Sequence, residues 1–337
     1  MHDALIIATS ISRQTLVDLH PHFRETRSRK ENTAVENDTS EFRYLPGQAA
    51  ALGVTAPRAE RLALPLPDGR TLSAIRYGDG SPEVTLLHGA GLNAHTWDTT
   101  VLLLQRPALA IDLAGHGDSS WRDDLDYSPQ TLAADVAIAL DAWTESPQVL
   151  VGQSLGGLTA VAVAAGRPAS VRDLIIVDIT AGVRGDAAPS VLGEFYQQTD
   201  FATLDEAVDR AMSFGFGSTR PETERGVFLN TRGRDDGRVE WKHHFAHLAG
   251  SALATAPDAG AAILASDRSW ADLASVTAPI TLVRATRGFV ADDDVAEFQT
   301  RRPDAAVRTV DATHNIQETA PAALASLIAE SADAVRR

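Results

Sequence analysis

Short apolar runs recur along the chain from about residue 60 onward. A strand that is covered on both faces of a sheet needs apolar residues at nearly every position, so such runs predict buried strands of a parallel sheet. The runs are Glu83–Leu87, Ala108–Ile111, Gln148–Val151, Leu174–Val177, Ile280–Val283 and Ala305–Val310. Ahead of them, Leu62–Leu66 and Thr71–Tyr77 flank Asp68-Gly69, a turn pair that predicts an antiparallel hairpin at the start of the sheet.

Helical patterns lie between these runs. Leu132, Val136 and Leu140 recur at helical spacing after Ser128-Pro129, a pair that suits an N-cap and a first-turn proline. Two further helices are predicted at Leu155–Gly166 and Leu324–Val335. Strands that alternate with helices predict an α/β fold around a mostly parallel sheet.

One interval of about a hundred residues breaks this alternation. It shows helical periodicity at Val191–Gln198, Leu204–Phe214 and Trp241–Leu248 and no convincing parallel strand. A loop of this length without structure of its own would be unusual in a compact domain. We therefore expect a helical cap at residues 181–275, inserted into a core formed by residues 59–180 and 276–337. Residues 1–58 are expected to form a partly flexible N-terminal extension, because part of this stretch is polar and of mixed charge.

Composition excludes several classes of function. The chain has 337 residues, and 30 Lys and Arg against 45 Asp and Glu leave a net charge of −15. Such a chain lacks the positive charge that nucleic acids and anionic membranes attract. The absence of cysteine excludes disulfides, thiolate metal sites and a cysteine nucleophile. Because the chain shows neither a membrane-spanning run nor a signal-peptide pattern, we expect a cytoplasmic protein without a nucleic-acid or membrane partner.

The strongest chemical signal is the sequence Gly152-Gln153-Ser154-Leu155-Gly156, which follows an apolar strand and opens a helix. In this strand–turn–helix setting a G-x-S-x-G motif places the serine on a sharp turn, where its hydroxyl is exposed for attack. Small glycines let strand and helix approach each other closely. The motif therefore predicts Ser154 as a nucleophile.

A second glycine turn, His88-Gly89-Ala90-Gly91, follows an earlier strand. Acyl-transfer chemistry needs two N–H donors that point at the developing oxyanion. We expect the N–H groups of Ala90 and Leu155 to supply them, and Gly89 to line the substrate site. His88 itself is expected to have a structural role.

His314 follows the last strand and precedes the last helix. A serine hydroxyl needs a base of near-neutral pKa to take its proton, and this loop returns to the same sheet edge. His243, His244 and His247 fall in the predicted cap, where packing is the simpler interpretation. Without the glutamate of an H-E-x-x-H pattern they do not indicate zinc, so we expect no metal site and no cofactor.

Together these pieces resemble the α/β-hydrolase superfamily, in its cap-bearing branch of esterases and lactonases. The resemblance covers about residues 60 to 335 and rests on His88–Gly91, Asp112–Ser119, Gly152–Gly157, Asp178 and His314. It implies an eight-stranded, mostly parallel sheet flanked by helices, with an inserted helical cap. It also implies a Ser–acid–His triad in that chain order.

The acid of that triad is the open question. Most of the superfamily places it after the next-to-last strand, but here no Asp or Glu follows Ile280–Arg284 until Asp292. Asp292 also suits the start of a helix, where acidic side chains are favoured. Asp178 ends the strand after the nucleophile helix, a position that a subset of the superfamily uses. We favour Asp178 and keep Asp292 as the alternative.

These residues predict a serine hydrolase that cleaves a moderately hydrophobic carboxylic ester or a lactone through an acyl-enzyme. Trp97 and Trp241 are expected to line an apolar pocket under the cap. The alternatives are a carbon–carbon bond hydrolase, a cofactor-free oxygenase on the same fold, or a ligand sensor that turns over slowly. The expected assembly is a monomer or a homodimer.

Overall fold

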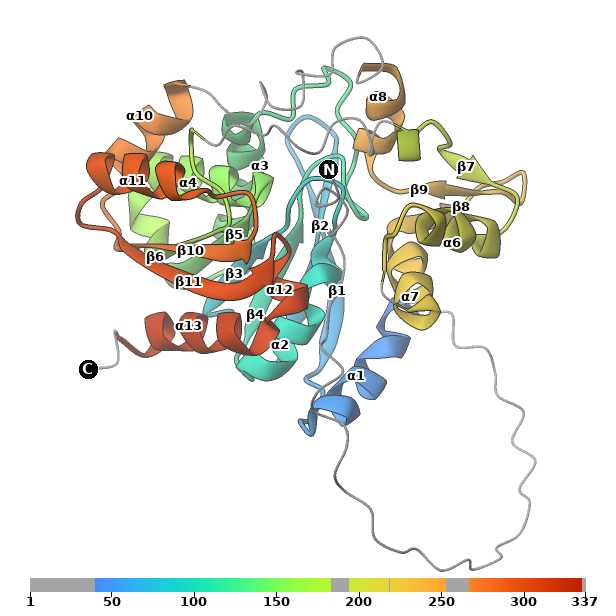
Figure 1. The fold of residues 1–337 in the computed structure, drawn as a ribbon, viewed down its shortest axis with the longest axis horizontal. Coiled ribbons are helices and arrows are strands. Elements are labelled where there is room, and N and C mark those ends of the chain that lie inside the picture. Colours follow the sequence, from blue (N-terminus) through green and yellow to red (C-terminus); the bar gives the residue numbers. More distant parts are fainter. Residues whose placement is uncertain (1–39, 183–193, 218, 253–266, 335–337) are drawn as a thin grey trace, which may run out of the picture.

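The computed structural model describes residues 40–182, 194–217, 219–252 and 267–334. An eight-stranded sheet runs through the centre of the molecule in the order β1-β2-β4-β3-β5-β6-β10-β11 (Figure 1). The strands are β1 (Ala59–Pro65), β2 (Thr71–Tyr77), β3 (Val84–Leu87), β4 (Ala108–Asp112), β5 (Gln148–Gln153), β6 (Val171–Val177), β10 (Ile280–Arg287) and β11 (Ala306–Thr313). β1 and β2 form the predicted antiparallel hairpin, and all pairings from β4 to β11 are parallel.

Helices cover both faces of this sheet (Figure 1). One layer consists of α3 (Pro129–Trp143), α4 (Leu155–Gly166), α10 (Asp267–Ser275) and α11 (Asp292–Arg301). The other consists of α2 (Asp98–Leu104) and α13 (Pro321–Ala334), with the short α12 (Ile316–Thr319) beside them. Successive residues of β5 point to opposite faces, so Leu150 packs in the first layer while Val149 and Val151 pack in the second. This is why its apolar run is continuous.

The interval predicted as a cap contains α6 (Leu204–Ser213), α7 (Arg220–Asn230) and α8 (His244–Ala252). It also contains a small antiparallel sheet in the order β7 (Asp200–Phe201), β9 (Val239–Trp241), β8 (Thr231–Gly233). The described part, residues 194–217 and 219–252, is called the inserted segment below. The helical pattern predicted at Val191–Gln198 lies partly outside the described residues, and the domain boundaries stay a prediction.

Part of the predicted N-terminal extension packs on the core. A 3₁₀ turn, η1 (Glu41–Tyr44), leads into α1 (Leu45–Leu52), whose Leu45 and Ala49 are buried. Leu45 packs in the same layer as α2. Two more 3₁₀ turns occur at η2 (Ala94–Trp97) and η3 (Pro168–Ser170). Residues 1–39 lie outside the described part of the chain.

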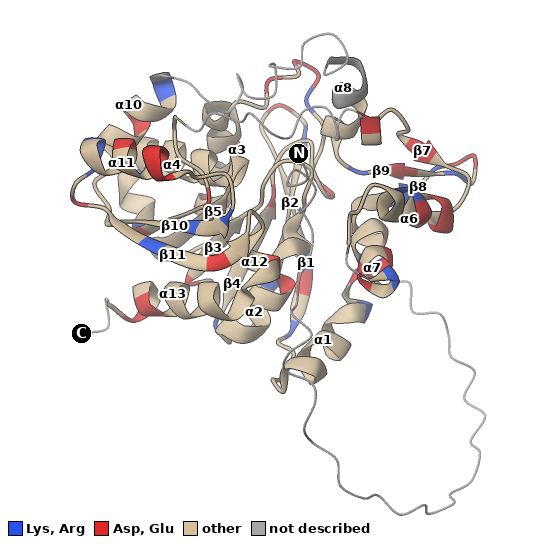
Figure 2. Ribbon diagram, viewed as in Figure 1, with Lys and Arg blue, Asp and Glu red and all other residues tan. Residues whose placement is uncertain are grey.

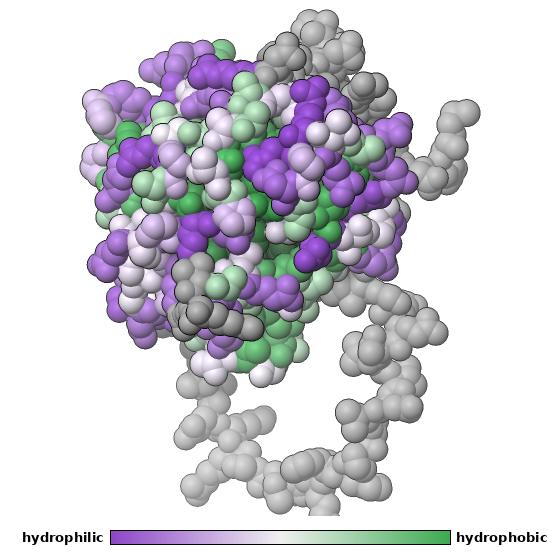
Figure 3. Space-filling view, turned by 90° about the vertical axis from the view of Figure 1, so that its left-hand side faces the viewer, coloured by the Kyte–Doolittle hydropathy of each residue, from purple (hydrophilic) through white to green (hydrophobic). Residues whose placement is uncertain are grey.

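Acidic residues are prominent on α6, β7 and β9 (Figure 2). On the face shown in Figure 3, hydrophilic and hydrophobic residues are interspersed across the described surface. Among the described residues, no helix combines the length and the apolar character that crossing a membrane requires.

Candidate active site

Ser154 sits on the turn that joins β5 to α4. Its backbone has φ 53° and ψ −120°, a conformation that residues with a side chain rarely adopt. The flanking glycines make this turn possible. A methyl group on Gly152 would lie 2.1 Å from the carbonyl oxygen of Gly156, and one on Gly156 would lie 2.3 Å from that of Leu87. The G-x-S-x-G motif thus forms the strand–turn–helix that its sequence predicts.

Asp178 and His314 form a buried pair at the same edge of the sheet. Asp178 directly follows β6 and His314 directly follows β11, and Nδ1 of the histidine lies 2.7 Å from Oδ2 of the aspartate. The carboxylate also accepts hydrogen bonds from the N–H groups of Ala285 and Phe289, each at 2.8 Å. Two backbone donors therefore orient the acid independently of the histidine.

The loop after β10 makes room for this carboxylate. A methyl group on Gly288 would lie 2.1 Å from Oδ2 of Asp178, so a side chain at this position would displace the acid. The same loop places the Phe289 ring on the His314 ring, with centroids 3.6 Å apart and an angle of 18° between the planes. The loop after β10, which has no acidic residue of its own, thus contacts the carboxylate of Asp178 at the end of β6.

The alternative acid, Asp292, lies elsewhere. Its side chain is 91% exposed at the first residue of α11 and pairs with Arg284. Within the described residues, the carboxylate that contacts His314 belongs to Asp178. Asp292 instead has the helix-terminal position that its sequence context predicts.

The His314 loop lies against the nucleophile turn. The side-chain amide of Gln153, the residue before the serine, donates to the carbonyl of His314 and to Oδ1 of Asn315, both at 3.4 Å. Because Nδ1–H of His314 donates to Asp178, its Nε2 is left with a free lone pair that can accept a proton. Ser154 and His314 are each 6% exposed, so both are shielded from bulk water.

The glycine loop predicted to bind the oxyanion passes directly over the serine. A methyl group on Gly89 would lie 3.2 Å from Cβ of Ser154 and 2.2 Å from Oε1 of Gln153. Leu155 is the first residue of α4, and the N–H groups of a first helical turn have no partner within the helix. Ala90, which is predicted to supply the other donor, is an exposed residue.

His88 holds this loop in place. Its Nε2 accepts from the N–H of Leu113 at 3.0 Å, and Nδ1 lies 2.8 Å from the carbonyl oxygen of Gly89. Burial lowers the pKa of His88 to about 4, so the ring is neutral at physiological pH. This is the structural role that the sequence predicts.

The two tryptophans predicted to line a pocket are both buried in packed cores. Trp97 is fully buried among core residues of the α2 and α13 layer, and its place in a pocket stays a prediction. Trp241 is 4% exposed and packs with Phe195 and Phe201 in the core of the inserted segment. The sequence alone does not reveal whether a tryptophan is part of a packed core or lines a pocket.

Among the described residues, no group of three or more His, Asp or Glu side chains could hold a metal ion. His243 is buried, and its Nδ1 accepts from the N–H of Ala246 at 3.1 Å. His244 stacks on Trp121, with ring centroids 4.3 Å apart, and its Nδ1 lies 2.7 Å from the Tyr127 hydroxyl. The contacts of His244 are packing interactions between the inserted segment and the core, whereas the hydrogen bond of His243 lies within the inserted segment.

Comparison with known proteins identifies the family. A model of the alpha/beta hydrolase family matches residues 86–327. Over 297 residues the chain is 34% identical to Esterase Rv0045c of Mycobacterium tuberculosis. This match covers 86% of this chain and 94% of that protein. The chain belongs to the alpha/beta hydrolase family.

A solved structure of the M. tuberculosis esterase Rv0045c matches with a TM-score of 0.72 and 32% identity. The match covers 87% of this hydrolase and 99% of that chain. Protein phosphatase methylesterase 1 of Mus musculus is 30% identical over 154 residues, which are 43% of this hydrolase and 40% of that protein. The predicted fold, an eight-stranded and mostly parallel sheet with flanking helices, is confirmed.

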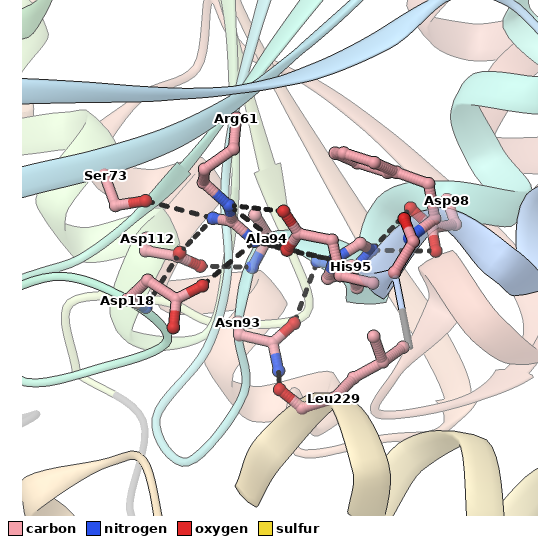
Figure 4. Close-up of polar contacts among 12 residues, drawn as sticks. Arg61, Ser73, Asn93, Ala94, His95, Asp98, Asp112, Asp118 and Leu229 are labelled. Atoms are coloured by element: carbon pink, nitrogen blue, oxygen red, sulfur yellow. Dashed lines mark hydrogen bonds and ion pairs between the residues drawn. The ribbon is translucent and has the colours of Figure 1, made fainter. Parts of the chain in front are cut away.

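The hydrolase also contains a partly buried polar network that the sequence did not reveal (Figure 4). His95 on η2 lies between two acids, with Nε2 3.0 Å from Oε2 of Glu41 and Nδ1 3.1 Å from Oδ2 of Asp98. Arg61 on β1 pairs with both Glu41 and Asp112. Arg225 on α7 donates to Oδ2 of Asp98 at 2.7 Å and to the carbonyl of His95 at 3.1 Å. We call the six residues Glu41, Arg61, His95, Asp98, Asp112 and Arg225 the polar joint.

The polar joint connects three parts of the chain. Glu41 belongs to the N-terminal stretch, Arg61, His95, Asp98 and Asp112 belong to the core, and Arg225 belongs to the inserted segment. Asn93 adds to this connection by donating to the carbonyl of Leu229 at 3.1 Å, as drawn in Figure 4. Asp112, whose Oδ1 accepts from the N–H of Ala94 at 2.7 Å, holds the start of η2 beside it.

Proposed function

We propose that this hydrolase cleaves carboxylic esters by nucleophilic catalysis at Ser154. The serine hydroxyl attacks the ester carbonyl while Nε2 of His314 accepts its proton. The histidine then gives that proton to the leaving alcohol, and an acyl-enzyme remains. Water, activated by the same histidine, releases the acid product and the free serine.

Two further elements stabilise charge in this scheme. The N–H groups of Ala90 and Leu155 donate to the oxyanion of the tetrahedral intermediate. Asp178 holds Nδ1 of His314 protonated and stabilises the imidazolium that forms when the ring accepts the second proton. Every group in this sequence of steps belongs to the chain or is water, and the steps need no cofactor.

The observation that carries the proposal is the buried Asp178–His314 hydrogen bond of 2.7 Å beside the strained serine turn. Such a pair, oriented by the N–H groups of Ala285 and Phe289, is the arrangement that activates a serine. The names of the similar proteins, an esterase and a methylesterase, support an ester as the substrate class. A moderately hydrophobic ester or a lactone, a cytoplasmic location, a helical cap and a monomer or homodimer remain predictions.

Labelling with a fluorophosphonate and hydrolysis of p-nitrophenyl butyrate test this proposal. We expect wild-type protein to be labelled at Ser154, and Ser154→Ala to lose at least about 10³-fold in kcat. Ser213→Ala removes a serine whose hydroxyl, within the part of the chain that the structure describes, donates to the carbonyl of Arg210. This variant serves as the matched control and should keep full activity. Hydrolysis that survives in Ser154→Ala, or a label on another residue, would contradict the proposal.

A further inference from the structure

Tyr196, from the inserted segment, reaches the glycine loop of the core. A methyl group on Gly91 would lie 3.3 Å from the Tyr196 hydroxyl oxygen and 3.9 Å from Cε1 of His243. Gly91 has φ 75°, a backbone conformation that disfavours any side chain, so the space above its Cα stays open to the hydroxyl. The hydroxyl is therefore placed beside the residue that follows Ala90.

The ring of Tyr196 is held firmly. It packs edge-on against Phe195, His243 and Phe245, with ring centroids 4.8, 5.1 and 5.7 Å away. Only 8% of the residue is exposed. A hydroxyl on a ring fixed in this way has a defined position, which is what selective recognition of a ligand atom requires.

The hydroxyl itself has no hydrogen-bond partner among the described residues. Burial alone raises the pKa of Tyr196, so the group is a neutral O–H donor over the whole physiological range. Its neighbour His243 does not compete for this proton, because Nδ1 of that ring already accepts from the N–H of Ala246. A hydroxyl that no described residue engages is available to donate to a bound ligand, or to a water that the ligand displaces.

We propose that Tyr196 is a substrate-binding residue whose hydroxyl donates a hydrogen bond to a second acceptor oxygen of the ester. This inference rests on the proposed function, because Ala90 is there the donor to the oxyanion. Consecutive Cα atoms lie about 3.8 Å apart, so a group above Gly91 meets a substrate atom two or three bonds from the scissile carbonyl. The site therefore prefers esters with an ether or carbonyl oxygen at that distance over plain alkanoates.

Two matched substrate pairs test this preference in wild-type protein and in Tyr196→Phe. On the acyl side, p-nitrophenyl methoxyacetate differs from p-nitrophenyl butyrate by one oxygen in place of a methylene group. On the alcohol side, methoxymethyl butyrate differs from propyl butyrate in the same way. For each ester the ratio of kcat/KM between wild type and variant cancels the intrinsic reactivity of the ester.

In one of the two pairs, we expect the ratio of wild-type to variant kcat/KM to be about 5- to 10-fold larger for the oxygenated ester than for its plain partner. The pair that shows this difference identifies whether Tyr196 contacts the acyl side or the alcohol side of the ester. A merely structural role would lower kcat/KM equally for both members. Ratios that agree within about twofold in both pairs would overturn the proposal. Tyr44→Phe, which removes a hydroxyl that accepts from Arg43, is the matched control and should treat all four esters alike.

The two proposals fail in different ways. If Ser154→Ala keeps hydrolysing these esters, the nucleophile is wrong and the proposed function fails. If turnover requires Ser154 but Tyr196→Phe treats both members of each pair alike, only the assignment of Tyr196 fails.

Discussion

At the scale of single residues, the position of the acid decides how this site works. Asp178 has φ 50°, and asparagine is one of the few residues that tolerate this backbone conformation. Asp178→Asn therefore keeps the turn while it removes the charge. The amide would donate to Nδ1 of His314 and leave the proton on Nε2, which is the wrong tautomer for accepting the serine proton. We expect kcat to fall by about 10³- to 10⁴-fold, measured on p-nitrophenyl butyrate.

Asp292→Asn is the matched control for that change. Its carboxylate is exposed and pairs only with Arg284 among the described residues, so the variant should keep kcat within about twofold of wild type. The assignment of Asp178 would be wrong if Asp292→Asn lost activity and Asp178→Asn kept it.

The sequence predicts the residues that carry a motif and misses those that act through the backbone. Ser154 and His314 follow strands and stand in recognisable surroundings, so the sequence alone identifies both as candidates. The donors to Asp178 are backbone N–H groups of Ala285 and Phe289, which any residue other than proline could supply. Tyr196 could not be found either, because its contact with Gly91 joins segments about a hundred residues apart.

At the scale of elements, the buried strands were the easiest to predict. The apolar run Gln148–Val151 falls within β5 (Gln148–Gln153), and Leu155–Gly166 coincides with α4, because continuous burial leaves a continuous apolar pattern. The small sheet of the inserted segment was missed. Its strands are two or three residues long, too short to show any periodicity.

Arg225 is one of the residues that join α7 to the core. The guanidinium reaches the carboxylate of Asp98, which is 1% exposed and also accepts from the Tyr77 hydroxyl at 2.6 Å. Arg225→Met keeps the length of the side chain and leaves the buried charge with fewer partners. We expect the free energy of unfolding to fall by about 1.5 to 3 kcal/mol, with faster amide hydrogen exchange in α7.

Arg220→Met provides the comparison on the same helix. Arg220 pairs with Asp205, Asp209 and Glu224 at the surface, and its side chain is 44% exposed. Exposed pairs contribute little, so this variant should change unfolding and exchange only slightly. Equal effects of the two variants would show that α7 is not held by the polar joint.

At the scale of the whole molecule, the polar joint makes folding stability depend on pH. Hydrogen bonds and charge from His95 and Arg61 lower the pKa of Glu41 to about 2, against the opposing effect of burial. The neighbouring acid Asp98, together with Glu41, raises the pKa of His95 despite its burial. Each group therefore favours the charged form of the other, and Glu41 joins the N-terminal stretch to the core through that pairing.

The pKa shifts of Glu41 and His95 change folding stability at opposite ends of the pH range. Unfolded Glu41 binds a proton near pH 4.5 and folded Glu41 only near pH 2, so its stabilisation is complete above about pH 4.5 and disappears as the pH falls toward 2. The contribution of His95 is complete below its unfolded pKa, about 6.5, and disappears as the pH rises through the higher folded value. The joint is therefore strongest between these limits.

Glu41→Gln removes the carboxylate whose protonation makes folding stability depend on pH in the acidic range. Near pH 5.5 the variant should unfold with a free energy lower than that of wild type by roughly 2 to 3 kcal/mol, and the difference should shrink toward zero near pH 2 and decrease again at alkaline pH. Chemical denaturation across this range measures the difference, and subtraction cancels the titrating groups that do not interact with Glu41. Glu60→Gln, on a half-exposed acid that pairs with Arg58 and Arg76, should show a small and flat difference. A flat difference for Glu41→Gln as well would mean that the charge of Glu41 does not stabilise the fold, and that other contacts, such as those of the buried Leu45 and Ala49, hold the N-terminal stretch.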